Sequence, residues 1–404
     1  MTEEAQKKIR GMVDLVMSYV VEPQPLSVPA VAETMDALVE RLSSGLTLKD
    51  PTSQDQQEEE TWDGELFGVR LAGLGKLYSN DITKVSLACK PPADPKTVIG
   101  MMDALAETSF RLAGFVESIP VKIAGQTYKR EVQTLANDIF LATAGLLNEF
   151  LDEKVEKVVQ IQKEGASIKR TIAGLNGAAG SVESEGTSAK DAYLAKTGIV
   201  WEACQIFERA SRTNREAVAK KWGDMMLTME DAISEVQEMI DSNDDKKDGD
   251  DEDDNDSDDD DGNDSDDSWN EDEKMTEEEK QLSVRANALM KLTKMLFKKL
   301  QQRCLDAAVT PSDITLKPSD LARMWDQLYD SAKGIVALAD EIATSLYSPQ
   351  DRPSIVALLQ ELGRKNHDCI LVGRLFVRGQ AEHEKWMDMC EAQTKKILDT
   401  VAQP

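Results

Sequence analysis

Cysteine and histidine are scarce in this 404-residue sequence, and neither occurs in a pattern that metal binding or catalysis requires. The five cysteines lie more than ten residues from one another, which excludes a CxxC pair and zinc-type spacing: Cys89, Cys204, Cys304, Cys369 and Cys390. Such a sparse, odd set predicts free, buried thiols in a reducing compartment. We therefore expect no metal site.

The two histidines, His367 and His383, both fall in predicted helices and are sixteen residues apart. A hydrolytic triad needs a histidine beside a nucleophile and an orienting carboxylate, and neither histidine has such neighbours in the pattern. Glu382 and Glu384 flank His383 as they would on an ordinary helix surface. We predict no catalytic residue, no cofactor and no enzymatic activity.

Long apolar runs and an excess of positive charge are also absent. No apolar stretch is long enough to span a bilayer, and the first ten residues, MTEEAQKKIR, lack the apolar core of a signal peptide. The formal net charge of the chain is −28. Phosphate backbones and anionic lipids repel such a chain, so we expect neither nucleic acid nor a membrane among its partners.

The acidic residues are concentrated in one tract. Between Asp241 and Glu273, twenty acidic residues and two lysines account for −18 of the −28. Repulsion between like charges and the lack of apolar side chains predict a disordered acidic linker over residues 241–274. Neither of its glycines, Gly249 and Gly262, is followed by the glutamate that completes an EF-hand loop, so we expect no tuned calcium site.

The acidic tract has three interpretations. Three of its serines precede acidic residues and are candidate phosphorylation sites for acid-directed kinases: Ser257, Ser265 and Ser268. A basic partner could instead dock on its acidic core and its one aromatic residue, for which the candidate residues are Asp258, Asp259, Asp260 and Trp269. The third interpretation is a solvated linker between two domains and nothing more, and all three stay open.

Apolar residues recur at helical spacing along most of the chain, and strand alternation is almost absent. This pattern predicts an all-α protein made of two bundles of long antiparallel helices. We place an N-terminal bundle at residues 1–240, with a flexible Gly/Ser connector near 174–190, and a C-terminal bundle at 275–404. The predicted helices are Thr2–Val20, Pro29–Gly45, Trp62–Cys89, Asp94–Ile119, Gln126–Ile161, Asp191–Ser211, Asn214–Ile240, Met275–Ala308, Ser319–Tyr347, Pro353–Val377 and Gln380–Val401.

Three leucines after the acidic tract, Leu282, Leu289 and Leu296, repeat every seven residues. A short zipper and one face of a bundle helix both produce this repeat. We favour the bundle and expect a monomer, although the repeat allows a dimer. Trp201 and Trp222 are predicted to anchor packing.

Four strings of the sequence are distinctive: TWDGELFGVRLAGLGKLY (61–78), IPVKIAGQTYKREVQTLANDIFLATAGLLNEFL (119–151), GIVWEACQ (198–205) and LADEIATSLYSPQ (338–350). In their order, and with the acid-rich stretch before the last of them, they resemble the cyclin-D-binding protein family, also described as adaptor- and cyclin-D-interacting proteins. Ser348 departs from the pattern, because a proline is expected there beside Pro349.

The resemblance implies a two-bundle, all-α protein, similar to helical adhesion and scaffold modules and without catalytic residues. It implies protein partners of the cyclin-D-like or helix-loop-helix kind, and negative regulation of cell-cycle progression by sequestering them. It also implies a location in both cytoplasm and nucleus.

Two other functions fit the composition. The acidic tract would suit a chaperone for histones or other basic proteins, whose binding falls steeply with salt. The helical bundles would suit a vinculin/catenin-like adaptor. Both alternatives stay open on the sequence alone.

Overall fold

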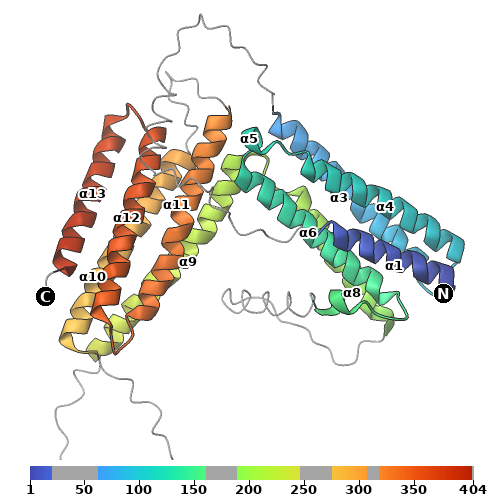
Figure 1. Ribbon diagram of the computed structural model, residues 1–404, viewed down its shortest axis with the longest axis horizontal. Coiled ribbons are helices and arrows are strands. Elements are labelled where there is room, and N and C mark those ends of the chain that lie inside the picture. The colour runs from blue at the N-terminus through green and yellow to red at the C-terminus, as the bar shows by residue number, and fades with distance from the viewer. Residues whose placement is uncertain (21–61, 161–188, 246–274, 307–317, 403–404) are drawn as a thin grey trace, which may run out of the picture. The chain divides into compact units, whose positions relative to one another are not determined.

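The computed structural model describes residues 1–20, 62–160, 189–245, 275–306 and 318–402, and every regular element in these ranges is a helix (Figure 1). The predicted all-α class is confirmed. None of these helices is both long enough and apolar enough to cross a bilayer. The described residues pack as two compact units that divide between Ala217 and Val218.

The first unit is a ring of five long helices around one core (Figure 1). In the order α1, α4, α3, α8, α6, each helix packs against the next, and α6 closes the ring on α1. The largest side chains buried at its centre are aromatic: Tyr78, Tyr128, Phe140 and Phe207. The helices are α1 (Glu3–Ser18), α3 (Gly64–Ala88), α4 (Pro95–Glu117), the short α5 (Val121–Ala124), α6 (Gln126–Glu149) and α8 (Ala189–Glu208).

Side-chain caps fix where the first helices begin. Thr2, Asp63 and Asp94 each accept a hydrogen bond from the backbone N–H three residues later, and each stands just before a helix. Such caps satisfy donors that have no partner inside the helix. The predicted starts of α1, α3 and α4 are therefore confirmed to within two residues.

The end of α6 differs from the prediction, which continued the helix to Ile161. The helix stops at Glu149, and the Oδ1 atom of Asn148 accepts a hydrogen bond from the backbone N–H of Val155 at 2.7 Å. Lys154 also donates to the Asn148 carbonyl oxygen at 2.8 Å. The prediction missed this stop because asparagine competes with the helix for backbone hydrogen bonds without a proline or glycine to mark the site.

The second unit holds most of α9 and the helices after the acidic tract. In it α12 packs against α11, α10 and α13, and α13 also packs against α10. Trp222 of α9 is fully buried, and its Nε1 atom donates to the Phe297 carbonyl oxygen at 3.2 Å. The elements are α9 (Asn214–Asp245), α10 (Glu277–Leu300), the π-helical turn η1 (Gln301–Asp306), α11 (Pro318–Ser345), α12 (Arg352–Phe376) and α13 (Ala381–Val401).

The leucine repeat on α10 lies in this second core. Leu282, Leu289 and Leu296 are each buried against neighbouring helices of the same unit. A zipper would need these side chains on the surface. The bundle interpretation is therefore confirmed.

The division between the units falls inside α9, whereas the sequence placed it after residue 240. Val218 to Ile240 contribute their apolar side chains to the second core, while Ala217 belongs to the first. The spacing of apolar residues stays the same along a continuous helix, so it does not predict the residue at which the helix passes from one core to the other.

Several predictions fall partly or wholly outside the described residues. The helix Pro29–Gly45 lies outside them, as does the connector near 174–190 apart from the first two residues of α8. The acidic tract lies outside from residue 246 onward. Its first five residues, 241–245, were predicted to be disordered but form the last turn of α9, because that helix carries its apolar stripe to Ile240 and continues beyond it.

Candidate protein-binding face

Helix α8 is apolar on two faces. Val200, Cys204 and Phe207 point into the first core and are fully buried. Four large apolar side chains on the rest of its surface remain exposed: Leu194 (56%), Ile199 (45%), Trp201 (40%) and Ile206 (46%). A cluster of this kind on a folded surface marks an interaction site, whereas single exposed apolar residues do not.

These four residues, which we call the α8 face, form two rows. Leu194 and Trp201 are seven residues apart, as are Ile199 and Ile206, and a separation of seven returns a side chain to nearly the same side of a helix. The outward surface of α8 is therefore edged by an apolar row on each side. A partner helix can rest on such a surface along its length.

Trp201 is held in place by the neighbouring helix. Its Nε1 atom donates to the Thr83 hydroxyl of α3 at 3.1 Å, and that hydroxyl donates to the Ser79 carbonyl oxygen at 2.9 Å. One turn beyond Thr83, the side chain of Leu87 is also exposed. Because the indole is already ordered, a partner that buries it loses less conformational entropy on binding. Tryptophan is also enriched among the residues that dominate interface energies.

The sequence prediction for Trp201 was wrong, whereas that for Trp222 is confirmed: Trp222 packs in a core and Trp201 does not. The sequence held a signal for this difference. Ile199, Val200 and Trp201 are consecutive, and three consecutive residues span about 200° of a helix, so they cannot all face one core. Only Val200 is buried.

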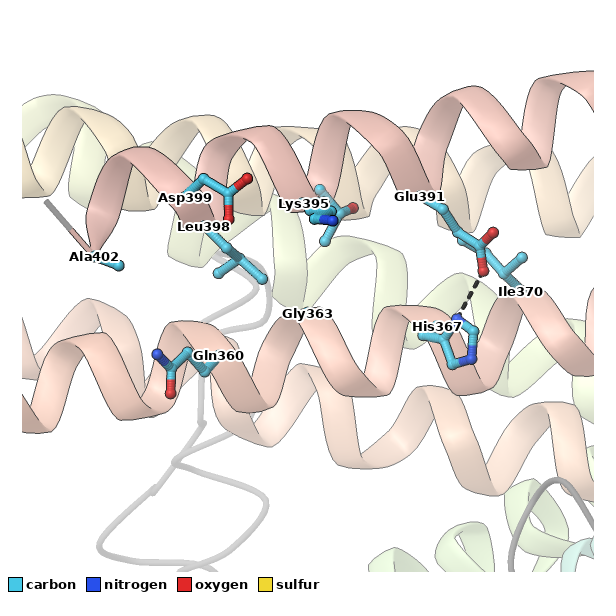
Figure 2. Close-up of a pocket in the computed structure, with 10 residues that line it drawn as sticks. Gln360, Gly363, His367, Ile370, Glu391, Lys395, Leu398, Asp399 and Ala402 are labelled. Carbon is cyan, nitrogen blue, oxygen red and sulfur yellow. Dashed lines mark hydrogen bonds and ion pairs between the residues drawn. The ribbon is translucent and has the colours of Figure 1, made fainter.

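A groove in the second unit runs between α12 and α13 (Figure 2). His367 of α12 faces Glu391 of α13, with 2.7 Å between Nδ1 and Oε1 (Figure 2). The other carboxylate oxygen of Glu391 accepts from Arg374 at 2.6 Å, and Arg374 also donates to Asp388 at 2.8 Å. These ion pairs tie α12 to α13.

The chemistry of this groove is limited by what surrounds His367. Thr394 is the only hydroxyl-bearing residue that lines it, and its Oγ1 atom is buried without a hydrogen-bond partner. A histidine activates a hydroxyl only when the two are hydrogen-bonded. Glu391 is occupied by Arg374, so the arrangement is that of an interhelical ion-pair network.

His383 is not the surface residue that its sequence neighbours suggested. Its side chain is buried near the start of α13, although Glu382 beside it is exposed. The sequence interpretation of this histidine was wrong, because a helix that starts against two neighbours covers part of its first turn.

All five cysteines are free and buried, as predicted. Burial raises the pKa of the Cys89 and Cys204 thiols to about 12 and that of Cys390 to about 11. Protonated thiols are poor nucleophiles and poor metal ligands. In the described ranges, no group of three acidic, histidine or cysteine side chains is arranged to hold a metal ion.

The sequence-predicted sites of the acidic tract cannot be related to this geometry. The phosphorylation candidates Ser257, Ser265 and Ser268 and the docking candidates Asp258, Asp259, Asp260 and Trp269 all lie outside the described residues. They remain predictions.

The described residues thus form a helical protein that exposes an apolar face on α8. Comparison with known families agrees with this class. The N-terminal model of the Grap2 and cyclin-D-interacting family matches residues 70–242, and its C-terminal model matches residues 248–367. These matches cover more than half of the chain, and the chain belongs to this family.

Two curated relatives were found in vertebrates. The Cyclin-D1-binding protein 1 homolog of Xenopus laevis is 24% identical over 210 residues, which are 52% of this chain and 51% of the relative. The homolog of the same name from Danio rerio is 27% identical over 215 residues, or 50% of this chain and 59% of the relative. The match thus spans little more than half the length of either relative.

Proposed function

We propose that this chain is a non-catalytic regulatory protein that binds a D-type cyclin through the α8 face. The observation that carries the proposal is the set of four exposed apolar side chains on one helix, one of which is an indole that α3 already holds in place. The names of the two relatives, both Cyclin-D1-binding protein 1 homologs, support the choice of partner. The α8 face also lies within the region that the N-terminal family model matches.

The proposed mechanism is sequestration. A cyclin whose apolar surface rests on the α8 face is withheld from its other partners, and this would slow cell-cycle progression. Such a protein acts wherever its cyclin is present, so the proposal includes both cytoplasm and nucleus. Phosphorylation of Ser257, Ser265 or Ser268 would add further negative charge to the acidic tract and is part of the same proposal.

Calorimetric titration of the purified full chain with a purified D-type cyclin tests the proposal. Trp201→Ala removes the largest side chain of the α8 face and should weaken binding about 30-fold, which corresponds to a hot spot of about 2 kcal/mol. Leu227→Ala is the matched control, because Leu227 is a single exposed leucine on α9 in the second unit. The control should bind as tightly as the unchanged chain.

A second variant separates this proposal from the acidic-chaperone alternative. In it, each Asp and Glu of residues 246–273 is replaced by Asn or Gln, so that the length of the tract is kept. Binding through the α8 face should survive this change and should change little with salt, because apolar contacts are not screened. If neutralising the tract or adding salt abolishes binding while Trp201→Ala has no effect, the chaperone function is correct instead.

A further inference from the structure

Basic residues gather where α10 ends in the second unit. Lys298 and Lys299 lie in its last turn, and Arg303 follows in the π-helical turn η1. A π-helical turn is rare and is found preferentially at functional sites. Positive side chains at a helix C-terminus interact favourably with the helix dipole. This explains why the residues at the end of α10 are basic, but it does not explain which residues surround them.

The first turns of α13 face this end of α10. The Nζ atom of Lys299 lies 5.5 Å from the centre of the Trp386 ring, within the range of a cation–π contact. Trp386 is itself partly buried against the second core. The contact therefore places the ammonium group of Lys299 beside α13.

His383 lies one turn before Trp386 and has an unused polar atom. Its side chain is 8% exposed, and its Nδ1 atom is buried without a hydrogen-bond partner. The Nε atom of Arg303 is buried and unpartnered in the same way. Buried polar atoms are nearly always hydrogen-bonded, so each of these two unsatisfied atoms has room for a further partner.

The charges around His383 show what kind of partner is missing. Burial, together with the positive charges of Arg303 and Lys299, lowers the pKa of His383, and Glu382 opposes this effect. Among the described residues, neither Lys299 nor Arg303 forms an ion pair with a carboxylate. Excess positive charge beside the unused N–H donor of Arg303 is the surrounding that an anion requires.

We propose that Lys299, Arg303 and His383 form a binding site for a phosphate or carboxylate group carried by a peptide segment. Arginine supplies a planar set of donors, lysine a point charge and the histidine ring a single N–H donor. His383 lies in the first turn of α13, a helix that starts without a side-chain cap. The acidic tract of the chain itself and an acidic or phosphorylated segment of a partner carry the same chemistry. This site is separate from the α8 face and does not depend on cyclin binding.

The test uses a synthetic peptide that copies residues 252–270 with phosphoserine at Ser257, and inorganic phosphate as the minimal probe. The protein is the full chain with the acidic residues of 246–273 replaced by Asn and Gln, so that its own tract cannot compete. We expect saturable binding of the peptide that weakens with salt. Arg303→Gln and Lys299→Gln should each raise the dissociation constant at least 10-fold.

Two further variants serve as controls. Glu382→Gln removes the opposing carboxylate and should tighten binding two- to threefold, a gain that damage to the fold would not produce. Lys333→Gln removes one exposed positive charge from α11 in the same unit and should leave binding unchanged. Thermal unfolding of each variant separates lost binding from lost structure.

Histidine NMR gives a second readout, because the chain has only two histidines. An anion at the site favours the charged imidazole, so the peptide should raise the pKa of His383, and the ring resonances of His367 should not move when the peptide is added. If the intact chain binds the peptide more weakly than the neutralised chain, its own tract occupies the site; if both bind equally, the site takes a partner's segment. The absence of saturable binding, or equal affinities for the Arg303→Gln and Lys333→Gln variants, would overturn the proposal.

Discussion

The two units present different surfaces to a partner. In the first unit, a single helix exposes four large apolar side chains, those of the α8 face. In the second unit, the exposed apolar residues are scattered over several elements: Leu227, Val284, Met295, Tyr347 and Met389. Scattered apolar residues are normal on a soluble surface, whereas a cluster on one helix is not.

The second unit is instead distinguished by charge. Its α12 and α13 are joined by the ion pairs of Arg374 and Glu391, and positive groups that pair with no carboxylate in the described part of the chain lie at the end of α10. Apolar contacts persist in salt, whereas contacts between charges are screened by it. The comparison teaches that the two proposed binding surfaces differ in their chemistry, so that salt should distinguish binding at one from binding at the other.

The largest expected effect compares one tryptophan from each unit. Trp222→Ala should lower the free energy of unfolding by about 4 kcal/mol, because it leaves a cavity in the second core and removes the hydrogen bond to Phe297. Trp201→Ala should cost less than about 1 kcal/mol, because its side chain is exposed and loses one surface hydrogen bond. Urea denaturation measures both. Equal costs would mean that Trp201 is part of the core and that the α8 face is not a free surface.

The next largest effect on stability is expected from replacing a glycine, and one glycine of each unit is compared. Gly125 has a φ of 92°, and a Cβ atom there would collide with the side chain of Asn214, whose Oδ1 atom accepts from the Tyr128 N–H at 3.0 Å. Gly125→Ala should therefore cost about 3 kcal/mol through backbone strain and overpacking. At Gly363 the Cβ atom would come too close only to the flexible end of Leu398 and would lie at van der Waals distance from Thr394, so Gly363→Ala should cost less than about 1 kcal/mol. Thermal unfolding that finds the reverse order would contradict the assigned backbone of the α5–α6 turn.

The smallest effect concerns two acids at helix starts. Hydrogen bonds from the backbone of Gln350 and Thr276 lower the pKa of Glu279 in the second unit, and hydrogen bonds from Thr97 lower that of Asp94 in the first. Each acid therefore stabilises the fold above its ordinary pKa, and this contribution is lost as the pH falls through its lowered value. Glu279→Gln should cost about 1 kcal/mol at pH 7, and the cost should fade as the pH falls through the lowered pKa of Glu279.

Asp94→Asn should cost less than Glu279→Gln, because Asp94 contacts only its own first turn. Glu279 also reaches the α11–α12 turn, where its Oε1 atom accepts from the Gln350 N–H at 2.9 Å. Denaturation at pH 7 and at low pH measures both variants. A cost for Glu279→Gln that does not change with pH would show that this carboxylate is not charged in the folded protein.

The sequence predicted helices well where a cap or a proline marked their limits. Asp94 and Pro95 fixed the start of α4, and the capping box of Thr276 and Glu279 marks the start of α10. The prediction failed at the end of α6, where Asn148 stops the helix by a hydrogen bond to a residue seven positions later. A local pattern reports a helix start more reliably than a stop that depends on a later segment.

The two candidate sites were harder to predict from the sequence than the fold was. The string around Trp201 was recognised as distinctive, but its tryptophan was assigned to the core. The cluster of Lys299, Arg303 and His383 was not predicted. His383 lies 80 residues after Arg303, and no sequence motif links it to the two basic residues. Only the packing of α13 against α10 brings them together.

The sequence by itself determined the all-α class, most of the helix limits and the burial of all five thiols. These follow from periodicity, capping and side-chain polarity, which act over a few residues. Only the tertiary structure decided where the packing of α9 changes from the first core to the second, and which apolar face of α8 is left open. The reason is physical. An apolar side chain gains a similar free energy from any surface that removes it from water, so the apolar pattern of a sequence does not determine which surface covers each side chain.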